Sequence, residues 1–521
     1  MAQVIKKLLL DTLKTYPKHP ALSIGENEYN YQQFLSPIIA YNKVLCQELK
    51  NEKAVAVLAN KSLSGYQCIA STFIAGKTYV PLNLRYPSKR NAEIIIQAGI
   101  KTILIDSSCE TIAEELYQYM DKSIRLIYLD TQENGTIKHR YVAAQNKQTT
   151  QNDISSDTAY LLFTSGSTGK PKGVPILDAN IQSYLTHISQ SYDFLPEDRF
   201  SQFFDFTFDL SLHDILVCWQ HGACLCPANK MGLLMPLQFA KRQSISIWFS
   251  VPSLALTAKD LMRHRFESFR LETIRYSFFC GEALPAQLAK EWLKITNHAT
   301  VINLYGPTEA TIALTAFNYQ NKSDDNMSVV QIGKPFGKNE CQIMSTNGSF
   351  CPVGKKGELC LSGPQVFSGY LGRENSSLSA FHLQKTNTRE NVYWYRTGDI
   401  ASQLENGNYI YHGRNDRQVQ VKGFRVELQE VEHQLRTLCS CGTLAVIAYP
   451  LNDIGEAVGL TAFIATQASE NTQLFEQCKQ LLPHYMLPDH FIPLDKFPYN
   501  ASGKLDYKQL KSIAAQQIKY L

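Results

Sequence analysis

The sequence predicts an α/β protein whose large N-terminal domain is built on doubly wound parallel sheets. Short apolar runs at 54–58, 79–82, 102–105 and 124–128 alternate with stretches of helical periodicity. Parallel strands are buried on both faces and need helical crossovers, so this alternation is the pattern expected of them. A chain of 521 residues is too long for one ordinary core, which indicates at least two domains.

The apolar residues at 4–13 recur at helical spacing and predict an amphipathic first helix before these strands. A polar segment at 131–157 is expected to be a surface connection. Short strands separated by glycines at 333–364 predict a β-rich subdomain. The charged, glycine-led stretch at 413–418 suggests a domain boundary, with an N-terminal domain at 1–415 and a small α+β domain at 416–521.

Composition excludes several classes of function. The hydrophobic content of 44% is typical of a globular protein. A net charge of +4 is small for this length, so the chain lacks the strong positive charge of proteins that bind nucleic acid. No apolar run approaches the roughly 20 residues that span a bilayer, so no membrane partner is expected. The thirteen cysteines lack the spacing of a zinc site, and we expect reduced thiols in a cytoplasmic protein.

A loop rich in glycine and hydroxyl side chains follows the apolar run at 159–163. Its sequence, TSGSTGKPKG at 164–173, suits a polyanion because glycines let backbone N–H groups converge and hydroxyls add donors. A Walker-type loop needs four residues between its first glycine and the Gly-Lys pair, followed by Ser or Thr. Here only two residues lie between Gly166 and the Gly169-Lys170 pair, and proline follows, so a Walker-type loop is excluded. A flexible connector of the same composition remains the alternative.

Asp209 stands in the aromatic run FFDFTFDLS, where a buried carboxylate is costly unless a cation meets it. The alternative is a helix N-cap, a position that Asp favours. Two later turns, at 280–283 and 305–309, each follow a strand, and α/β sheets bind ligands at such junctions. Asp399 is expected on a turn after aromatic residues, and Lys504 lies on a tight turn where a solvated surface lysine is the ordinary expectation.

Taken in order, the motifs TSGSTGKPKG, FDLS, YGPTE, YRTGD, GRNDRQVQVKGFRVEL and NASGKLD resemble the adenylate-forming ligase superfamily. The resemblance covers nearly the whole chain. It implies a large N-terminal domain and a small, mobile C-terminal lid that rotates between two half-reactions. The first joins a carboxylate to ATP as acyl-adenylate and pyrophosphate, and the second passes the acyl group to a thiol.

The resemblance also implies an ATP site with Mg²⁺. Glu309 would ligate the metal ion, and Thr308 would contact the α-phosphate. The β- and γ-phosphates would be held by Thr164, Ser165, Thr168 and Lys172.

The remaining roles divide between the nucleoside and the moving lid. Asp399 would bind the ribose with help from Arg414. Lys504 would be the catalytic lysine, and Asp416 the hinge. The adenine slot would be lined by Gly281, Glu282, Ala283, Asn303 and Tyr305. The family usually carries lysine after Gln-Val in the hinge motif, where this chain has Gln420, so the thiol step loses its usual lysine.

The substrate is expected to be an amino acid, because amino-acid activators use the aspartate of FD-x-S for the α-ammonium and Asp209 stands there. The segment 279–285 resembles D-alanine ligases of D-alanyl carrier proteins, whereas the pocket as a whole resembles stand-alone prolyl activators. We therefore rank L-proline first and D-alanine second, with a separate phosphopantetheinylated carrier protein as partner. An acyl-CoA synthetase for a small carboxylic acid is the alternative. The expected pocket lining is Asp209, Leu210, His213, Phe249, Phe278, Cys280, Leu304, Ile312 and Ala313.

Overall fold

A computed structural model of the chain describes residues 3–120, 124–133, 136–142, 154–166, 170–297, 299–320, 327–372, 379–384, 392–438, 443–452, 455–465, 471–499 and 505–518. These residues form two compact units. The first comprises 1–84, 94–163 and 173–415, and the second comprises 85–93, 164–172 and 416–521. Among the described helices, none combines the length and the apolar character that crossing a membrane requires.

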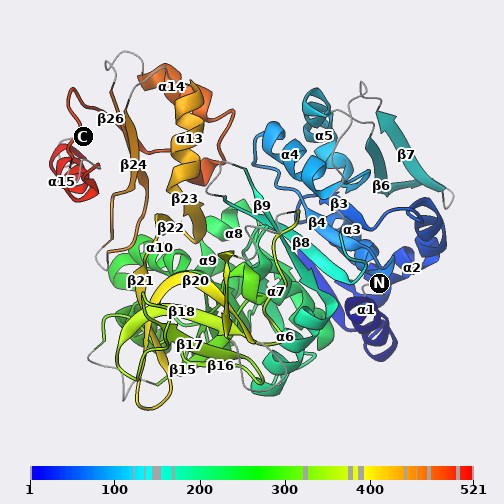
Figure 1. Cartoon of the computed structure of the whole chain (residues 1–521). Helices are drawn as coiled ribbons and strands as arrows, with labels where there is room; N and C mark the ends of the chain where they lie inside the picture. The colour runs from blue at the N-terminus through cyan, green and yellow to red at the C-terminus, as the bar shows by residue number, and fades with distance from the viewer. Residues whose placement is uncertain are drawn as a thin grey trace. The chain divides into compact units, whose positions relative to one another are not determined.

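The first unit, which is coloured from blue through green to yellow in Figure 1, contains a nine-stranded sheet. Its six central strands are parallel, and β2, β15 and β16 are antiparallel at the edges. The doubly wound parallel sheet expected from the sequence is therefore confirmed at its centre, while the edges make it mixed. In spatial order the strands are β16 (Lys334–Pro335), β15 (Thr315–Tyr319), β14 (Thr300–Tyr305), β13 (Tyr276–Phe279), β12 (Ile247–Ser250), β10 (Arg199–Gln202), β11 (Cys224–Pro227), β1 (Pro20–Ile24) and β2 (Asn27–Asn30).

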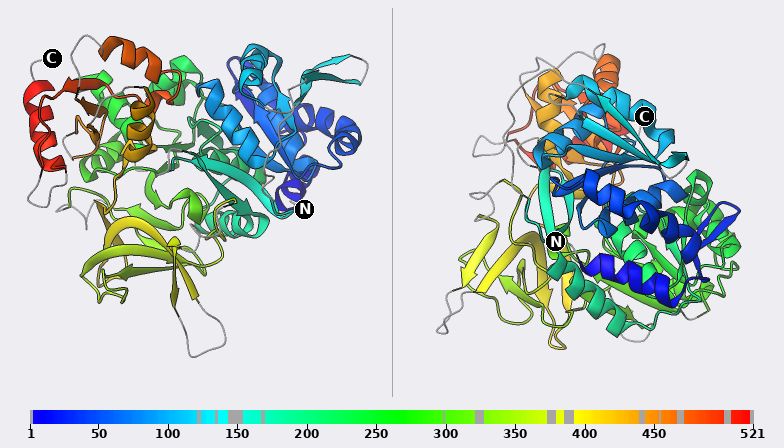
Figure 2. Two further views of the ribbon diagram at one scale, coloured as in Figure 1. Left: turned by 45° about the horizontal axis from the view of Figure 1, so that its top comes forward. Right: turned by 90° about the vertical axis from the view of Figure 1, so that its right-hand side faces the viewer.

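A second, seven-stranded sheet contains the four early apolar runs as β3, β4, β5 and β6. The polar segment 131–157 is not simply a connection, because it contains the end of β6 and the antiparallel strand β7. These two strands lie side by side, in cyan, at the edge of the sheet (Figure 2). The spatial order is β7 (Thr136–Val142), β6 (Ile124–Glu133), β5 (Thr102–Ile105), β3 (Ala54–Leu58), β4 (Thr78–Pro81), β8 (Thr158–Thr164) and β9 (Lys172–Leu177).

The helices between these strands pack apolar faces into the core. The predicted first helix is α1, which buries Ile5 and Leu9, and nearly every residue of α7 is buried. The helices before residue 415 are α1 (Val4–Thr15), α2 (Tyr31–Glu48), α3 (Leu63–Ile74), α4 (Ser88–Ala98), α5 (Glu110–Leu116), α6 (Asp178–Ser191), α7 (Asp209–Gln220), α8 (Lys230–Leu234), α9 (Pro236–Arg242), α10 (Pro252–Met262) and α11 (Ala286–Ile295).

The expected β-rich subdomain is a five-stranded antiparallel sheet. Asp399 lies in its long strand β20 rather than on a turn, at a register shift beside Gly398, whose φ is +75°. Such a bulge re-aims side chains without ending the strand. The sheet consists of β17 (Glu340–Met344), β18 (Lys356–Ser362), β20 (Val392–Gln403), β19 (Phe381–Gln384) and β21 (Tyr409–Arg414).

The second unit has the α+β character that the sequence predicts. A β-hairpin leads into α13, which packs against a three-stranded sheet through an apolar core that includes Val426, Val431 and Leu435. Its elements are β22 (Gln418–Val421), β23 (Phe424–Glu427), α13 (Leu428–Leu438), β24 (Leu444–Ala448), β25 (Leu460–Ile464), α14 (Asn471–Cys478), β26 (His490–Pro493) and α15 (Tyr507–Gln517).

A buried ion pair ties α13 to the segment 85–93 within this unit. The guanidinium of Arg90 contacts the carboxylate of Glu430, and the side chains are 7% and 0% exposed. The backbone N–H of Gly166 donates to the other oxygen of Glu430 at 3.1 Å. Removing one member of such a pair leaves the other charge buried without its partner.

We expect Arg90→Met to destabilise the second unit by about 3–5 kcal/mol, and Arg90→Met with Glu430→Met to recover most of that loss. The double variant leaves no charge buried at this place. Hydrogen exchange of α13, measured across a urea series, gives both values. Lys479→Met is the control, since Lys479 and Glu476 form an exposed pair whose loss costs less than about 1 kcal/mol. Equal destabilisation in the single and double variants would contradict the prediction.

Candidate active site

Asp209 is the first residue of α7, at the carboxyl end of the parallel strands, and only 6% of it is exposed. The N-cap position belongs to Phe208, and no side chain caps the helix. The capping alternative for Asp209 is therefore wrong. The acid is a buried side chain that needs another explanation.

Burial raises the pKa of the Asp209 carboxyl to about 7. The hydroxyl of Thr308 and the N–H groups of Leu210 and Ile312 act in the opposite direction, while the nearby charge of Glu309 adds to the rise. Oδ2 of Asp209 is buried and has no hydrogen-bond partner among the described residues. The site thus combines groups that favour the ionised form of Asp209 with one oxygen that no described residue satisfies.

The structure brings the predicted apolar lining residues together around the ends of β12, β13 and β14. Phe249 is the Cα partner of Phe278 in adjacent parallel strands, and Cys280 directly follows β13. All of them are buried members of one hydrophobic cluster. These residues are Leu210, Phe249, Phe278, Cys280, Leu304, Ile312 and Ala313.

His213, one turn along α7 from Asp209, is fully buried and neutral. Burial lowers the pKa of its imidazole to about 3. Nδ1 lies 2.6 Å from the hydroxyl of Tyr184, and Nε2 has no partner within the described part of the chain. The ring packs edge-on against Phe249 at a centroid distance of 4.5 Å. His213 is therefore a neutral aromatic side chain packed against the expected lining residues, not a charged group.

The nucleoside residues predicted on three separate elements form one hydrogen-bonded group. The hydroxyl of Tyr305 donates to Oδ2 of Asp399 at 2.5 Å, and Nη1 of Arg414 lies 2.5 Å from Oδ1. Nη2 of Arg414 also donates to the carbonyl of Thr397 at 3.0 Å. Burial raises the pKa of the Tyr305 phenol, and Asp399 raises it further, so the phenol is a donor.

The residues expected to line the adenine slot lie after β13 and in β14. Gly281 has a φ of +89°, a conformation that side chains disfavour. The carboxylate of Glu282 accepts the N–H of Ser253 at 2.7 Å, in the first turn of α10, and Ala283 follows it on the same loop. The amide of Asn303 donates to the carbonyls of Val330 and Gln331, and its Oδ1 is buried without a partner among the described residues.

Glu309 supplies a carboxylate that is suitable for Mg²⁺. It is 1% exposed, lies in a short 3₁₀ turn with Thr308, and accepts the hydroxyl of Tyr370 at 2.9 Å. The described residues contain no group of three or more His, Cys, Asp or Glu side chains that could enclose a metal ion. A single carboxylate completed by phosphate oxygens and water is the usual way Mg²⁺ is held beside a nucleotide.

The glycine-rich loop joins β8 to β9, so Thr164 ends one strand and Lys172 begins the next. The hydroxyl of Ser165 donates to the carbonyl of Arg425 at 3.1 Å. At Gly166, an added Cβ would lie 2.2 Å from the carbonyl oxygen of Lys170, so only glycine fits. Thr168 and Lys504 lie outside the described residues.

The predicted hinge Asp416 begins the last segment of the second unit, and its carboxylate accepts the N–H of Gln418 at 3.1 Å. Gln420, where the family usually has lysine, lies in β22, and its Oε1 is buried with no partner in the described part of the chain. The loss of that lysine leaves a neutral amide in its place.

Three side chains that contact the predicted site residues or their backbone were not predicted from the sequence. Tyr184 contacts His213, Tyr370 contacts Glu309, and the fully buried Gln365 contacts the backbone around Ile312. Only Gln365 had a local signal, since it follows the turn signal Gly363-Pro364.

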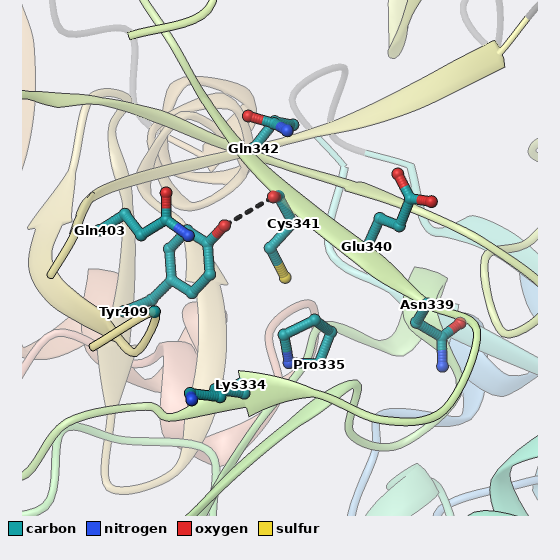
Figure 3. Close-up of a pocket in the computed structure, with 9 residues that line it drawn as sticks. Lys334, Pro335, Asn339, Glu340, Cys341, Gln342, Gln403 and Tyr409 are labelled. Carbon is teal, nitrogen blue, oxygen red and sulfur yellow. Dashed lines mark hydrogen bonds between the residues drawn. The ribbon is translucent and has the colours of Figure 1, made fainter. Parts of the chain in front are cut away.

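Two shallow surface pockets are separate from these residues. One, of about 340 Å³, lies between β16, β17 and the loop before β21, where Tyr409 donates to the carbonyl of Cys341 at 2.6 Å (Figure 3). The other, of about 330 Å³, is lined by residues such as His19 and Arg199. Neither pocket includes a predicted site residue.

Several known proteins resemble this chain. Bacitracin synthase 3 of Bacillus licheniformis is 30% identical over 98% of the chain, which spans only 8% of that relative. The D-alanine–D-alanyl carrier protein ligase of Bacillus cereus (strain G9842) is 30% identical over 84% of the chain and 85% of its own length. The Vibrio cholerae adenylation domain AlmE, solved with glycyl-adenosine-5'-phosphate, superposes with a TM-score of 0.86 and 30% identity over 98% of both chains.

The model of the AMP-binding enzyme family matches residues 9–371, which include the glycine-rich loop, Asp209 and Glu309. The match covers well over half of the chain and agrees with the fold. The chain is therefore a member of the AMP-binding, adenylate-forming enzyme family and a ligase.

Proposed function

We propose that this ligase activates a small apolar amino acid as its aminoacyl-adenylate and then transfers it to the phosphopantetheine thiol of a carrier protein. One observation carries the amino-acid part of this proposal: Oδ2 of Asp209 is buried and unpartnered among the described residues, while the expected apolar lining residues are buried in one hydrophobic cluster. A substrate α-ammonium is a cation that would satisfy it. An acyl chain without the ammonium would leave the carboxylate buried and unpaired.

In the first half-reaction, the substrate carboxylate attacks the α-phosphorus of ATP and pyrophosphate leaves. Asp399 and Arg414 would hold the ribose, with Tyr305 fixing the Asp399 carboxylate. Oδ1 of Asn303 is available to an amino-group donor, which the 6-amino group of adenine provides. Gly281, Glu282 and Ala283 would line the adenine slot.

The phosphates would be bound by Thr164, Ser165, Thr168 and Lys172, with Thr308 at the α-phosphate. Mg²⁺, held by Glu309, would neutralise phosphate charge. Lys504 would stabilise the charge that develops on the substrate carboxylate and the α-phosphate. In the second half-reaction, the carrier thiol displaces AMP to form the thioester, with Asp416 as the proposed hinge between the steps.

The carrier protein is supported by the relatives rather than by any contact. A D-alanyl carrier protein is the acceptor named for the Bacillus cereus ligase. An adenylation domain joined to a peptidyl carrier protein has the same fold, at 21% identity and a TM-score of 0.80. An acyl-CoA synthetase would use the same fold with a different thiol.

The side chain of the substrate must be compact, because Phe249, Phe278 and His213 pack against one another in the pocket wall. L-Proline remains our first choice from the pattern of lining residues. D-Alanine is named for the carrier protein ligase, and the AlmE structure contains the glycyl-adenylate. All three side chains are small and uncharged.

We expect ATP–pyrophosphate exchange to be fastest with one of these small amino acids and slow with charged or long ones, since the expected lining residues are buried and mostly apolar. A panel of D- and L-amino acids with glycine, assayed with the purified chain, measures this order. Fastest exchange with L-proline supports the first choice, and fastest exchange with D-alanine or glycine replaces it. A preference for a charged amino acid would contradict the proposed class.

We expect Asp209→Asn to lower kcat/KM for the amino acid by a factor of some hundreds or more, because an unpaired buried cation costs about 3–5 kcal/mol. Activation of the desamino acid, cyclopentanecarboxylic acid for proline or propionic acid for alanine, should be unchanged or improved. Asp214→Asn is the matched control, since Asp214 lies on the same helix, is buried, and has no hydrogen-bond partner for either oxygen among the described residues. A wild-type preference for the desamino acid would favour the acyl-CoA synthetase instead.

We expect Lys504→Ala to abolish pyrophosphate exchange while leaving transfer from a chemically made aminoacyl-adenylate largely intact. The lysine is proposed to act only while charge builds at the α-phosphate. Lys508→Ala, which removes a nearby exposed lysine, is the control. Exchange that survives within about tenfold would show that the assignment is wrong, since the loss of a transition-state charge contact costs more than that.

A further inference from the structure

The segment that follows Glu309 contains a strained turn. Thr311 and Ile312 have φ values of +58° and +71°, although both are β-branched residues that disfavour this region. The N–H of Ala313 donates to the carbonyl of Thr311 at 2.9 Å, which closes a three-residue γ-turn of the rare positive-φ form centred on Ile312. A turn of this kind persists only where its surroundings hold it.

One residue, Gln365, holds both ends of this turn, through its side chain and its backbone carbonyl. Nε2 of Gln365 donates to the carbonyl of Ala313 at 2.8 Å and to that of Ala310 at 3.4 Å. The hydroxyl of Thr311 donates to the backbone carbonyl of Gln365 at 2.6 Å. Gln365 is fully buried, so water does not compete for these hydrogen bonds.

Gln365 is itself fixed by Asn339. The amide of Asn339 donates to Oε1 of Gln365 at 2.7 Å and to the carbonyl of Phe336 at 3.0 Å. Oδ1 of Asn339 accepts the backbone N–H of Gln365 at 3.2 Å. The glutamine side chain therefore has one defined orientation, with its amino group directed at the turn.

The same turn also contributes to the proposed substrate site. The N–H of Ile312 faces the carboxylate of Asp209 and lowers its pKa. Ile312 and Ala313 also belong to the apolar lining. Gly306 keeps the space for them, since an added Cβ there would lie 2.7 Å from the Cα of Ala313.

We propose that Gln365 is a positioning residue for amino-acid recognition: it holds the strained Thr311–Ala313 turn so that the Ile312 N–H orients the carboxylate of Asp209 and the turn closes the pocket. This inference rests on the proposed activation of an amino acid. Gln365 does not touch the substrate, and its effect passes through the turn. A purely structural role would change stability without changing which substrate is preferred.

The test is the ratio of kcat/KM for the cognate amino acid to kcat/KM for its desamino acid, measured by adenylate formation with Gln365→Met. Methionine keeps the volume of the side chain and removes its hydrogen bonds. We expect the ratio to fall by about tenfold or more, while KM for ATP stays within about twofold of the wild-type value. An unchanged ratio in a folded variant overturns the inference.

Two further variants make the result specific. Gln365→Leu also removes the donor to Ala313 without introducing an ionisable group, and it provides the same readout if the methionine variant does not fold. Gln243→Met is the matched control: this buried glutamine binds Ser23 and Arg199 and has no contact with the turn, so its ratio should stay at the wild-type value. If the wild type itself prefers the desamino acid, the proposed function fails. If only the variant ratio is unchanged, the inference alone fails.

Discussion

The candidate site depends on one constraint, which is the burial of the Asp209 carboxylate with an oxygen that has no partner among the described residues. A carboxylate in an apolar environment loses its hydration, and folding tolerates this only if nearby groups compensate. Here Thr308 and two backbone N–H groups compensate in part, which leaves the pKa near 7 rather than far higher. The compensation is incomplete at Oδ2, which has no partner among the described residues. A cation bound there would therefore pair with a carboxylate that has already lost its hydration.

The topology of the sheet explains how distant residues meet at this carboxylate. Strands β10, β12, β13 and β14 are parallel, so their carboxyl ends share one edge, and the residues just beyond each end face one another. The expected pocket lining comes from the ends of three of these strands, from the start of α7 and from the turn at Ile312 and Ala313. A substitution that alters one strand end would therefore change the pocket without touching the others.

The strands and the turns that follow them could be predicted from the sequence, because apolar runs and the polar residues that end them are local signals. Asp209 was singled out in this way as an acid in an aromatic run, whereas Phe249 and Leu304 lie inside strands and were assigned to the expected lining only through the family resemblance. Gln365 and Tyr184 could not be predicted, since their role depends on a hydrogen bond to a segment more than 25 residues away in the chain. The bulge at Asp399 and the strand β7 were mispredicted for a related reason: a glycine in a strand and a polar edge strand both look like loops when pairing is unknown.

Four buried carboxylates in this chain show what distinguishes a binding group from a structural one. Glu430 has Arg90, and Asp399 has Arg414, so each is paired within its own unit. Asp214 has no hydrogen-bond partner for either oxygen among the described residues, and burial raises its pKa well above the usual value, which favours the uncharged acid over a carboxylate that would need a cation. Of these four, Asp209 alone combines an unsatisfied oxygen with donors that favour the ionised form, and it does so at the ends of the parallel strands. An unpaired buried acid alone is therefore weak evidence for a ligand, whereas one whose surroundings support its charge is strong evidence for a cationic group on the substrate.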